Sequence, residues 1–206
     1  MRNFCKLITI LFLSGTSFAA PQVGKVAPDF ALKGHDGKTY KLSSLKGQFV
    51  VLEWFNNDCP YVDKHYHEKV RNMQNLQMKW AEKAKKAGKK LTWLSVVSSA
   101  PGKQGFVKAQ EAKKIRDQRK AHMAAILLDP SGKVGKAYEA KTTPHMFLID
   151  EKGILRYDGA IDNKPSARLS SLDGASNYVS TGLDSMMMGQ TPKVSKTKPY
   201  GCSVKY

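Results

Sequence analysis

Apolar runs of two lengths alternate with polar segments along the chain. Near-continuous apolar stretches of strand length cover residues 48–55 (QFVVLEWF) and 91–97 (LTWLSVV). Such runs are typical of central strands that are buried on both faces. A shorter apolar run at 125–128 predicts a further strand.

Two turn sequences, HDG at 35–37 and EKG at 151–153, each lie between short strand-like segments. The predicted strands around them are 31–33 with 39–42, and 146–149 with 154–157. A glycine-containing turn between two such segments indicates a β-hairpin. We therefore expect one hairpin near the N-terminus and a second one late in the chain.

Apolar residues at spacings of three and four predict the helices. The longest predicted helix covers 60–87, begins at Pro60 and ends before Gly88. Three further helical segments are predicted at 103–120, 134–138 and 172–188. The order β-β-β-α-β-α-β-α-β-β-α combines crossovers with a terminal hairpin, which predicts an α/β fold with a mixed sheet and helices on both faces.

Composition and the N-terminal sequence define the expected domain organisation. With 206 residues, 41% of them apolar and 25% charged, the chain is long enough for one globular domain and excludes disorder, collagen and a disulfide-rich miniprotein. Residues 1–19 resemble a secretory signal, with two basic residues before an apolar run and small residues before a cleavage point. We expect a domain at 20–190, a polar tail at 191–206, and a periplasmic or secreted location.

The chain is strongly basic, with a formal net charge of +17 that falls to +15 once Arg2 and Lys6 are removed with the signal. Its lysines are scattered over predicted helices without interleaved aromatic residues. This pattern indicates solvated helix faces and weak affinity for an anionic membrane surface. It does not indicate nucleic-acid binding, and we expect a monomer.

Two cysteines, Cys59 and Cys202, remain after loss of the signal, 143 positions apart. Cys59 precedes Pro60 at the start of a predicted helix, where the helix dipole favours a thiolate. Lys64 and His65 would add positive charge there. Two alternatives remain open: Cys59 as a small buried hydrophobic residue, and Cys202 as one half of a static disulfide.

Residues 143–145 form a second sequence feature, Thr-Pro-His directly before an apolar strand. Pro144 is a candidate for a cis peptide bond. His145 is interpreted as a hydrogen-bonded structural residue, with a catalytic role as the alternative.

Three sequence motifs resemble the peroxiredoxin-like and redoxin branch (alkyl hydroperoxide reductase/thiol-specific antioxidant) of the thioredoxin superfamily. The first is GKVAPDFALKGHDGKTYKLSSLKGQFVVLEWFNNDCP, ending at Pro60; the second is the threonine and proline before HMFLIDEKG; the third is the final PYGCSVKY, which resembles the terminus of an exported bacterial group. The likeness extends over residues 23–158. It implies a thioredoxin-like fold, a mixed central sheet flanked by helices, with an N-terminal hairpin and a C-terminal helix plus tail.

The resemblance also implies site roles. It places Cys59 at the reactive cysteine, Pro144 at the cis-proline that faces it, and Glu53 at a buried acid that shuttles a proton during exchange. For Glu53, an end-of-strand charge turned to solvent is the alternative.

The chain departs from the family pattern at three places. Val62 stands where thioredoxins have their second cysteine. Asn56 and Leu52 replace the threonine or serine and the proline of peroxiredoxins, and Pro144 occupies the position of their peroxide-polarising arginine. Asn56 or Asn57 would offer a bound oxygen a single hydrogen bond, so we expect slow reaction with peroxides.

The leading hypothesis is an exported thiol-dependent oxidoreductase. Cys59 attacks a disulfide or, slowly, a small peroxide; Cys202 resolves the product from a flexible tail; and a thiol of unknown identity supplies electrons, with no cofactor. One alternative is a copper-binding chaperone with Cys59, His65, His67 and His145 as ligands and Met186–Met188 nearby. Another alternative is a redox-inactive binding module in which Cys59 is buried and inert.

Overall fold

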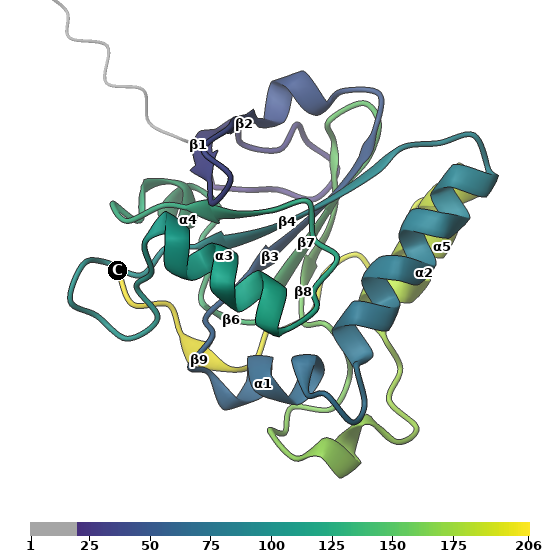
Figure 1. Cartoon of the computed structure of the whole chain (residues 1–206). Helices are drawn as coiled ribbons and strands as arrows, with labels where there is room; N and C mark the ends of the chain where they lie inside the picture. The colour runs from purple at the N-terminus through teal and green to yellow at the C-terminus, as the bar shows by residue number, and fades with distance from the viewer. Residues whose placement is uncertain (1–19) are drawn as a thin grey trace, which may run out of the picture.

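The computed structural model describes residues 20–206, so the predicted signal sequence at 1–19 lies outside the described residues. A central mixed sheet has the strand order β2-β1-β5-β4-β3-β7-β8 (Figure 1). Its strands are β1 Ala31–Gly34, β2 Thr39–Lys41, β3 Phe49–Trp54, β4 Leu91–Val97, β5 Ala125–Leu128, β7 His145–Ile149 and β8 Leu155–Gly159. A separate short ladder joins β6 Thr142–Thr143 to β9 Cys202–Ser203.

The sheet confirms the predicted mixture of connections. Strand β3 runs parallel to β4, and β4 runs parallel to β5, whereas β7 is antiparallel to both β3 and β8. The two predicted hairpins form β1–β2 and β7–β8. All six residues of β3 are buried because the strand lies inside the sheet and is covered on both faces.

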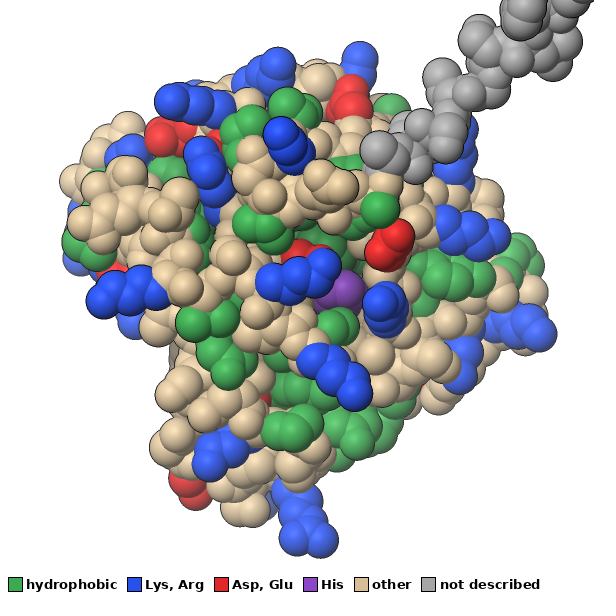
Figure 2. All heavy atoms as spheres, turned by 180° about the vertical axis from the view of Figure 1, so that it is seen from behind, with side chains coloured by type: hydrophobic (Ala, Val, Ile, Leu, Met, Phe, Trp, Pro, Cys, Tyr) green, Lys and Arg blue, Asp and Glu red, His purple; other side chains and the backbone are tan. Residues whose placement is uncertain are grey.

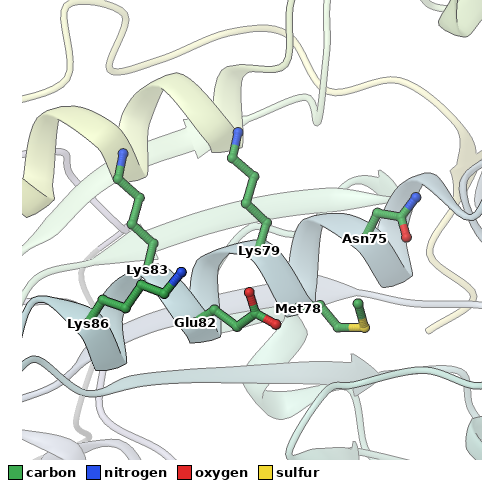
Figure 3. A pocket seen from close by; sticks show the side chains of 6 residues that line it. All are labelled: Asn75, Met78, Lys79, Glu82, Lys83 and Lys86. Atoms are coloured by element: carbon green, nitrogen blue, oxygen red, sulfur yellow. The ribbon is translucent and has the colours of Figure 1, made fainter.

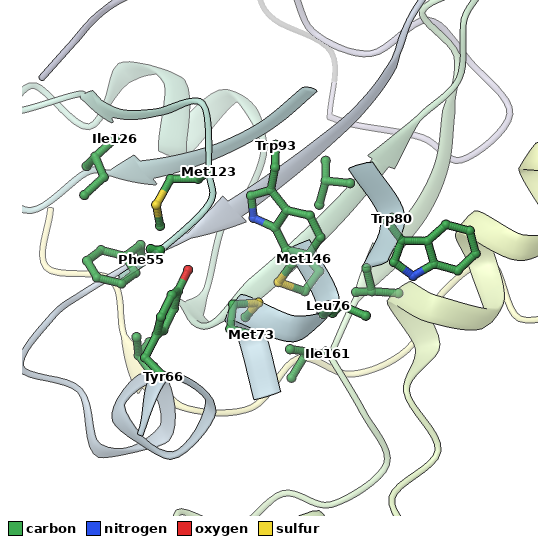
Figure 4. Close-up of a cluster of buried hydrophobic side chains, with 14 of the residues drawn as sticks. Phe55, Tyr66, Met73, Leu76, Trp80, Trp93, Met123, Ile126, Met146 and Ile161 are labelled. Carbon is green, nitrogen blue, oxygen red and sulfur yellow. The ribbon is translucent and has the colours of Figure 1, made fainter. Parts of the chain in front are cut away.

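Alternate residues of the central strands point into two separate apolar clusters. Val51 and Leu148 contribute to the first, and Val50 and Leu52 to the second. The first cluster packs against α1, α2, α3 and α5, and Figure 4 shows its aromatic and methionine side chains. The second is covered by the N-terminal segment and by the end of α4. The helices are α1 Pro60–Tyr66, α2 Asn72–Lys86, α3 Ala109–Gln118, α4 Lys133–Ala137 and α5 Tyr178–Met187.

The single helix predicted for 60–87 is wrong, because the chain breaks between α1 and α2. Arg71 adopts a left-handed conformation with φ of 49°, and its N–H donates to the carbonyl of His67. The Gln74 side chain donates to the Tyr66 carbonyl that the helix end leaves open. Val70, predicted on the buried face, is 37% exposed as a result.

Two other helices begin later than predicted. Helix α3 starts at Ala109, six residues after the predicted start, because positive-φ Gly102 and Gly105 lie in turns before it. Helix α5 starts at Tyr178, where the Asn177 side chain accepts a hydrogen bond from the Ser180 N–H and caps the helix. A 3-10 turn, η2 Leu169–Leu172, precedes it.

The tail at 191–206, which was predicted to be flexible, is packed against the domain and contains a short strand. Its β9 strand pairs with β6, and Lys196 bridges to Asp158 on β8. Beyond β9, Val204 donates its N–H to Lys141, and the Tyr206 hydroxyl donates to the carbonyl of Ala140. Figure 1 shows this yellow segment passing beside α1.

The surface carries its basic residues singly. Figure 2 shows lysine and arginine side chains spread over the face opposite to that of Figure 1, separated by other side chains. A shallow hollow of about 390 Å³ on α2 is lined by Asn75, Met78, Lys79, Glu82, Lys83 and Lys86, one face of a single helix (Figure 3). Among residues 20–206, no helix is both long and apolar enough to cross a bilayer.

Candidate functional site: a cysteine pair at the cis-proline

Cys59 is held at the junction of β3 and α1. It is the N-cap residue of α1 with Pro60 at the first helical position, as the sequence predicted. The N–H groups of Val62 and Asp63 donate to the Cys59 carbonyl. The helix therefore orients the residue through its backbone, and the sulfur makes no capping hydrogen bond.

The Cys59 sulfur has two polar neighbours. It lies 3.1 Å from the carbonyl oxygen of Thr143 and 2.7 Å from the sulfur of Cys202. The Thr143–Pro144 peptide bond is cis, as predicted. Register in the β6–β9 ladder pairs Thr143 with Cys202, so the tail strand brings the second cysteine directly to the first. Both cysteines are free thiols, and Cys59 is 0% exposed.

The Cys202 thiol is a weak acid in the folded protein. Burial, and then the adjacent Cys59 sulfur, raise the pKa of the Cys202 thiol to about 12. At neutral pH it therefore remains protonated. The two sulfurs lie within hydrogen-bond distance of each other.

Glu53 lies inside the protein, and the solvent-facing alternative is wrong. Its Oε2 accepts hydrogen bonds from the Tyr66 hydroxyl, the Trp93 indole N–H and the Ser95 hydroxyl, whereas Oε1 has no protein partner. Burial raises the pKa of Glu53 to about 7 despite the three donors. This carboxyl is therefore able to gain or lose a proton near neutral pH, as its predicted role requires.

Lys64 and His65 surround the tail residue Tyr200. The Lys64 amine lies 3.4 Å from the Tyr200 hydroxyl and also contacts the Lys164 carbonyl. The Nε2 of His65 lies 3.5 Å from the same hydroxyl. Burial lowers the pKa of Lys64, and burial followed by the charge of Lys64 lowers the pKa of His65 to about 3, so His65 is neutral. The prediction that His65 adds positive charge near Cys59 is therefore wrong. The hydrogen bonds of the Lys64 amine go to Lys164, Ser171 and Tyr200.

Asn56 is buried, and its side-chain oxygen accepts the Asp58 N–H in the loop before Cys59. Its side chain packs against Gly105, where an added Cβ would approach to 2.4 Å. The Asn56 side chain therefore helps to hold the conformation of the loop before Cys59. A role of its amide towards a bound oxygen stays a prediction.

The other histidines are dispersed. His145 pairs with Asp158 at 2.7 Å and accepts the Lys141 N–H through Nδ1, which matches its structural interpretation. His67 contacts the Lys69 N–H at the end of α1. Within residues 20–206 no three histidine, cysteine or acidic side chains could together hold a metal ion. The alternative metal site of Cys59, His65, His67 and His145 is therefore not assembled among these residues, and Met186 packs into the apolar core.

Sequence reasoning missed two residues beside the pair. Tyr200 donates its hydroxyl hydrogen to Asp162 at 2.5 Å, and the second oxygen of Asp162 is buried without a hydrogen-bond partner. The position of Tyr200, two residues before Cys202 in PYGCSVKY, was the one available signal. Asp162 lies in a polar loop after β8 and gave none.

Curated relatives of this chain include thiol-exchange proteins. It is 28% identical over 138 residues to the thioredoxin-like protein YneN of Bacillus subtilis, a match that covers 66% of this chain and 69% of that protein. It is 27% identical over 132 residues to the thiol-disulfide oxidoreductase ResA of Bacillus cereus, covering 64% of this chain and 66% of ResA. Each match thus extends over about two thirds of the relative.

A solved structure extends the likeness to nearly the whole chain. An uncharacterized conserved protein from Geobacillus kaustophilus superposes with a TM-score of 0.71 at 25% identity, covering 93% of this chain and 94% of that one. The thioredoxin-like fold is thereby confirmed. The model of the AhpC/TSA family matches residues 23–158, from before β1 into β8 and including Cys59 and Pro144. The chain belongs to the AhpC/TSA family.

Proposed function

We propose that this protein is a thiol–disulfide oxidoreductase whose redox couple is Cys59 and Cys202. The observation that carries the proposal is the 2.7 Å contact between two free cysteine sulfurs at the cis-proline. The kinship with thiol-disulfide oxidoreductases supports the same reaction class. In this chain the tail supplies the second cysteine, since Val62 stands where thioredoxins place theirs.

The exchange has two balanced steps. The Cys59 thiolate attacks one sulfur of a partner's disulfide, forms a mixed disulfide and releases the other partner sulfur as a thiolate, which takes up a proton. Cys202 then loses its proton and attacks the Cys59 sulfur. This second step forms the Cys59–Cys202 disulfide and releases the partner's remaining sulfur as a thiol. The partner gains two electrons, and an external dithiol restores the couple by the reverse steps.

Glu53 is the proposed proton carrier of the second step. The pKa of Cys202 lies well above neutral pH, so its attack needs a base. Glu53, with its pKa raised to about 7, is partly ionised at neutral pH, and its carboxylate would accept the proton that Cys202 releases. Its proposed path to the cysteine pair runs through water.

Reduction of small peroxides is proposed as a slow second activity. Membership in the AhpC/TSA family favours it. Neither the threonine nor the arginine that polarises peroxide in that family is present, and Asn56 uses its side-chain oxygen within its own loop. We expect oxidation by hydrogen peroxide orders of magnitude slower than at a complete peroxiredoxin site. Stopped-flow measurement at near diffusion-limited rates would instead classify the protein as a peroxidase.

The proposed setting is outside the cytoplasm. The signal-like sequence at 1–19 and the pair of cysteines in the remaining chain support a periplasmic or secreted monomer that exchanges with protein thiols and disulfides. The basic surface supports weak affinity for anionic membranes. Detection of the cleaved chain in a periplasmic or culture fraction tests the location.

Mass spectrometry of the reduced protein after addition of glutathione disulfide tests the couple. We expect an intramolecular disulfide with loss of two hydrogen atoms. Cys202→Ser protein should stop as a glutathione adduct on Cys59, and Cys59→Ser protein should form no intramolecular bond. Failure of Cys59 to react with glutathione disulfide or with iodoacetamide in the native protein would favour the redox-inactive binding module.

A further inference from the structure

The tail covers the reactive sulfur even when both cysteines are reduced. Cys59 is 0% exposed, and its sulfur touches Cys202 in the tail strand β9. Just before it, the tail backbone lies so close to the cis-proline segment that a Cβ on Gly201 would be 2.0 Å from the Thr143 carbonyl oxygen. A partner's disulfide therefore reaches Cys59 only after this part of the tail moves away.

Tyr200 is the side chain that anchors the tail next to the pair. Its hydroxyl donates to Asp162 and lies within 3.5 Å of both the Lys64 amine and His65. The same amine lies 5.2 Å from the centre of the Tyr200 ring. The phenol is thus held at its oxygen by hydrogen bonds and at its ring by a cation.

The pocket around Tyr200 is fixed by the domain itself. Lys64 is 1% exposed and also contacts the Lys164 carbonyl and the Ser171 hydroxyl. Asn72 contacts the Nδ1 of His65, and the Lys164 N–H donates to the Asp162 oxygen that Tyr200 uses. These partners all belong to loops and helices outside the tail.

The same pocket limits how strongly the tail is held. Docking buries the Lys64 amine and the Asp162 carboxylate, whose second oxygen has no hydrogen-bond partner. Opening lets water reach both groups, and this hydration offsets part of the lost hydrogen bonding. The arrangement therefore favours the closed tail without locking it.

We propose that Tyr200 is a positioning residue that holds the tail over Cys59 and thereby acts on the two exchange steps in opposite directions. It slows the attack of Cys59 on a partner's disulfide, because that attack needs the tail to open. It speeds the attack of Cys202 on the mixed disulfide, because that attack needs the tail to close. This inference rests on the proposed redox couple.

Rapid-quench mass spectrometry on the full chain measures both steps with glutathione disulfide as the probe. The first rate is that of glutathione addition to Cys59, and the second is that of glutathione release as the Cys59–Cys202 bond forms. In Tyr200→Phe the closed state loses hydrogen bonds to charged partners. We expect addition to be faster by roughly tenfold and release to be slower by a similar factor.

Tyr40→Phe is the matched control, because the Tyr40 hydroxyl donates to Asp36 in the N-terminal hairpin, which lies at the far edge of the sheet. We expect it to leave both rates unchanged. Lys64→Met is the second test variant, used also if Tyr200→Phe does not fold, and should change the two rates in the same opposite senses.

The outcomes separate this inference from the proposed function. Suppose that the unmodified protein forms the Cys59–Cys202 bond, but Tyr200→Phe leaves both rates unchanged or shifts them in the same direction. The role of Tyr200 is then overturned, and the redox couple is retained. Absence of that bond in the unmodified protein overturns the redox couple and, with it, this inference. Opposite shifts in Tyr200→Phe and none in Tyr40→Phe support both.

Discussion

The two sulfurs of the cysteine pair are 2.7 Å apart but are held by very different parts of the molecule. Cys59 follows β3, a strand with all six residues buried and paired on both sides by β4 and β7. Cys202 lies on a two-residue strand near the end of the chain, attached by polar contacts and by Tyr200 and Tyr206. One sulfur lies at a junction anchored by the central sheet and α1, and the other lies on a short segment at the edge of the domain.

This difference fits the division of labour in disulfide exchange. In the proposed exchange, Cys59 would benefit from a fixed position beside the cis-proline, whereas Cys202 would have to move away to admit a partner and then return. Regions of low local stability are where such movements occur. We expect substitutions in the sheet below Cys59 to change the free energy of global unfolding. Substitutions in the tail around Cys202 should instead change how well the tail covers Cys59.

The largest expected effect is on the framework side. Leu52 is fully buried in the middle of β3, and Leu52→Ala should lower the free energy of unfolding by about 2–5 kcal/mol. Urea denaturation followed by circular dichroism measures this. Met78→Ala, at a 38% exposed position on α2, is the control and should change it by less than about 1 kcal/mol. A similarly small loss in Leu52→Ala would show that β3 does not form the framework.

Gly201→Ala should displace the tail while leaving the framework intact. The added Cβ would lie 2.0 Å from the Thr143 carbonyl oxygen, and the φ of 137° is unfavourable for alanine. We expect labelling of Cys59 by iodoacetamide to be faster by roughly tenfold or more, a change in opening free energy of about 1.4 kcal/mol or more, located by digestion and mass spectrometry. Gly174→Ala is the control, because φ is +65° there and nothing lies within 4 Å of the new Cβ. It should leave the labelling rate of Cys59 unchanged. Unchanged labelling of Cys59 in Gly201→Ala would mean that the tail does not cover it.

Glu53 should give the framework a stability that depends on pH. Its pKa is raised in the folded protein to about 7 from an ordinary 4.5, so the folded state retains a proton that the unfolded state loses between these values. Stability from this group is complete below about pH 4.5 and falls as pH rises to about 7, by at most about 1.4 kcal/mol per pH unit. Relative to the unmodified protein, Glu53→Gln should lack this contribution to the pH dependence in urea titrations, and Glu82→Gln, at an exposed position, should retain it. An identical slope in Glu53→Gln would show that another group is responsible.

His65 should give an effect of the opposite sign. Burial and Lys64 lower its pKa to about 3, so the folded state keeps it neutral while the unfolded state gains a proton below about pH 6.5. Stability from this group is present above pH 6.5 and falls with decreasing pH, by about 1 kcal/mol between pH 7 and 5.5. His65→Asn, which keeps an acceptor for Asn72, should lose this fall, whereas His122→Asn, at an exposed position, should keep it. If His65→Asn protein still loses stability on acidification as before, His65 is not the group that titrates.

The strands and the nucleophile were predictable because they leave local signals. Buried strands such as β3 and β4 appear as apolar runs, and Cys59-Pro60 marks a strand-to-helix junction. The break at Arg71 was not predictable, since the apolar spacing continues across it and a left-handed arginine has no sequence signature.

The closure of the site by the tail was also beyond local reasoning. Strands β6 and β9 contain two residues each, too few for any periodicity, and their partners lie about sixty positions apart. Lys64 likewise has the local sequence pattern of an ordinary charged residue, and only the family resemblance placed Glu53 inside; the burial of both depends on contacts from distant elements. The location and burial of these residues depend on tertiary packing, which local sequence patterns do not reveal.

The 143-residue separation of the adjacent cysteines has a thermodynamic consequence. A bond between them would join most of the described chain into one covalent ring, and on the chain-entropy model it would destabilise the unfolded ensemble by about 5 kcal/mol. Linkage requires the reverse as well: folding makes the ring easier to close by the same amount of free energy. The melting temperature of the protein would therefore rise on oxidation, and a thermal scan in defined thiol buffers would report the oxidation state of the pair.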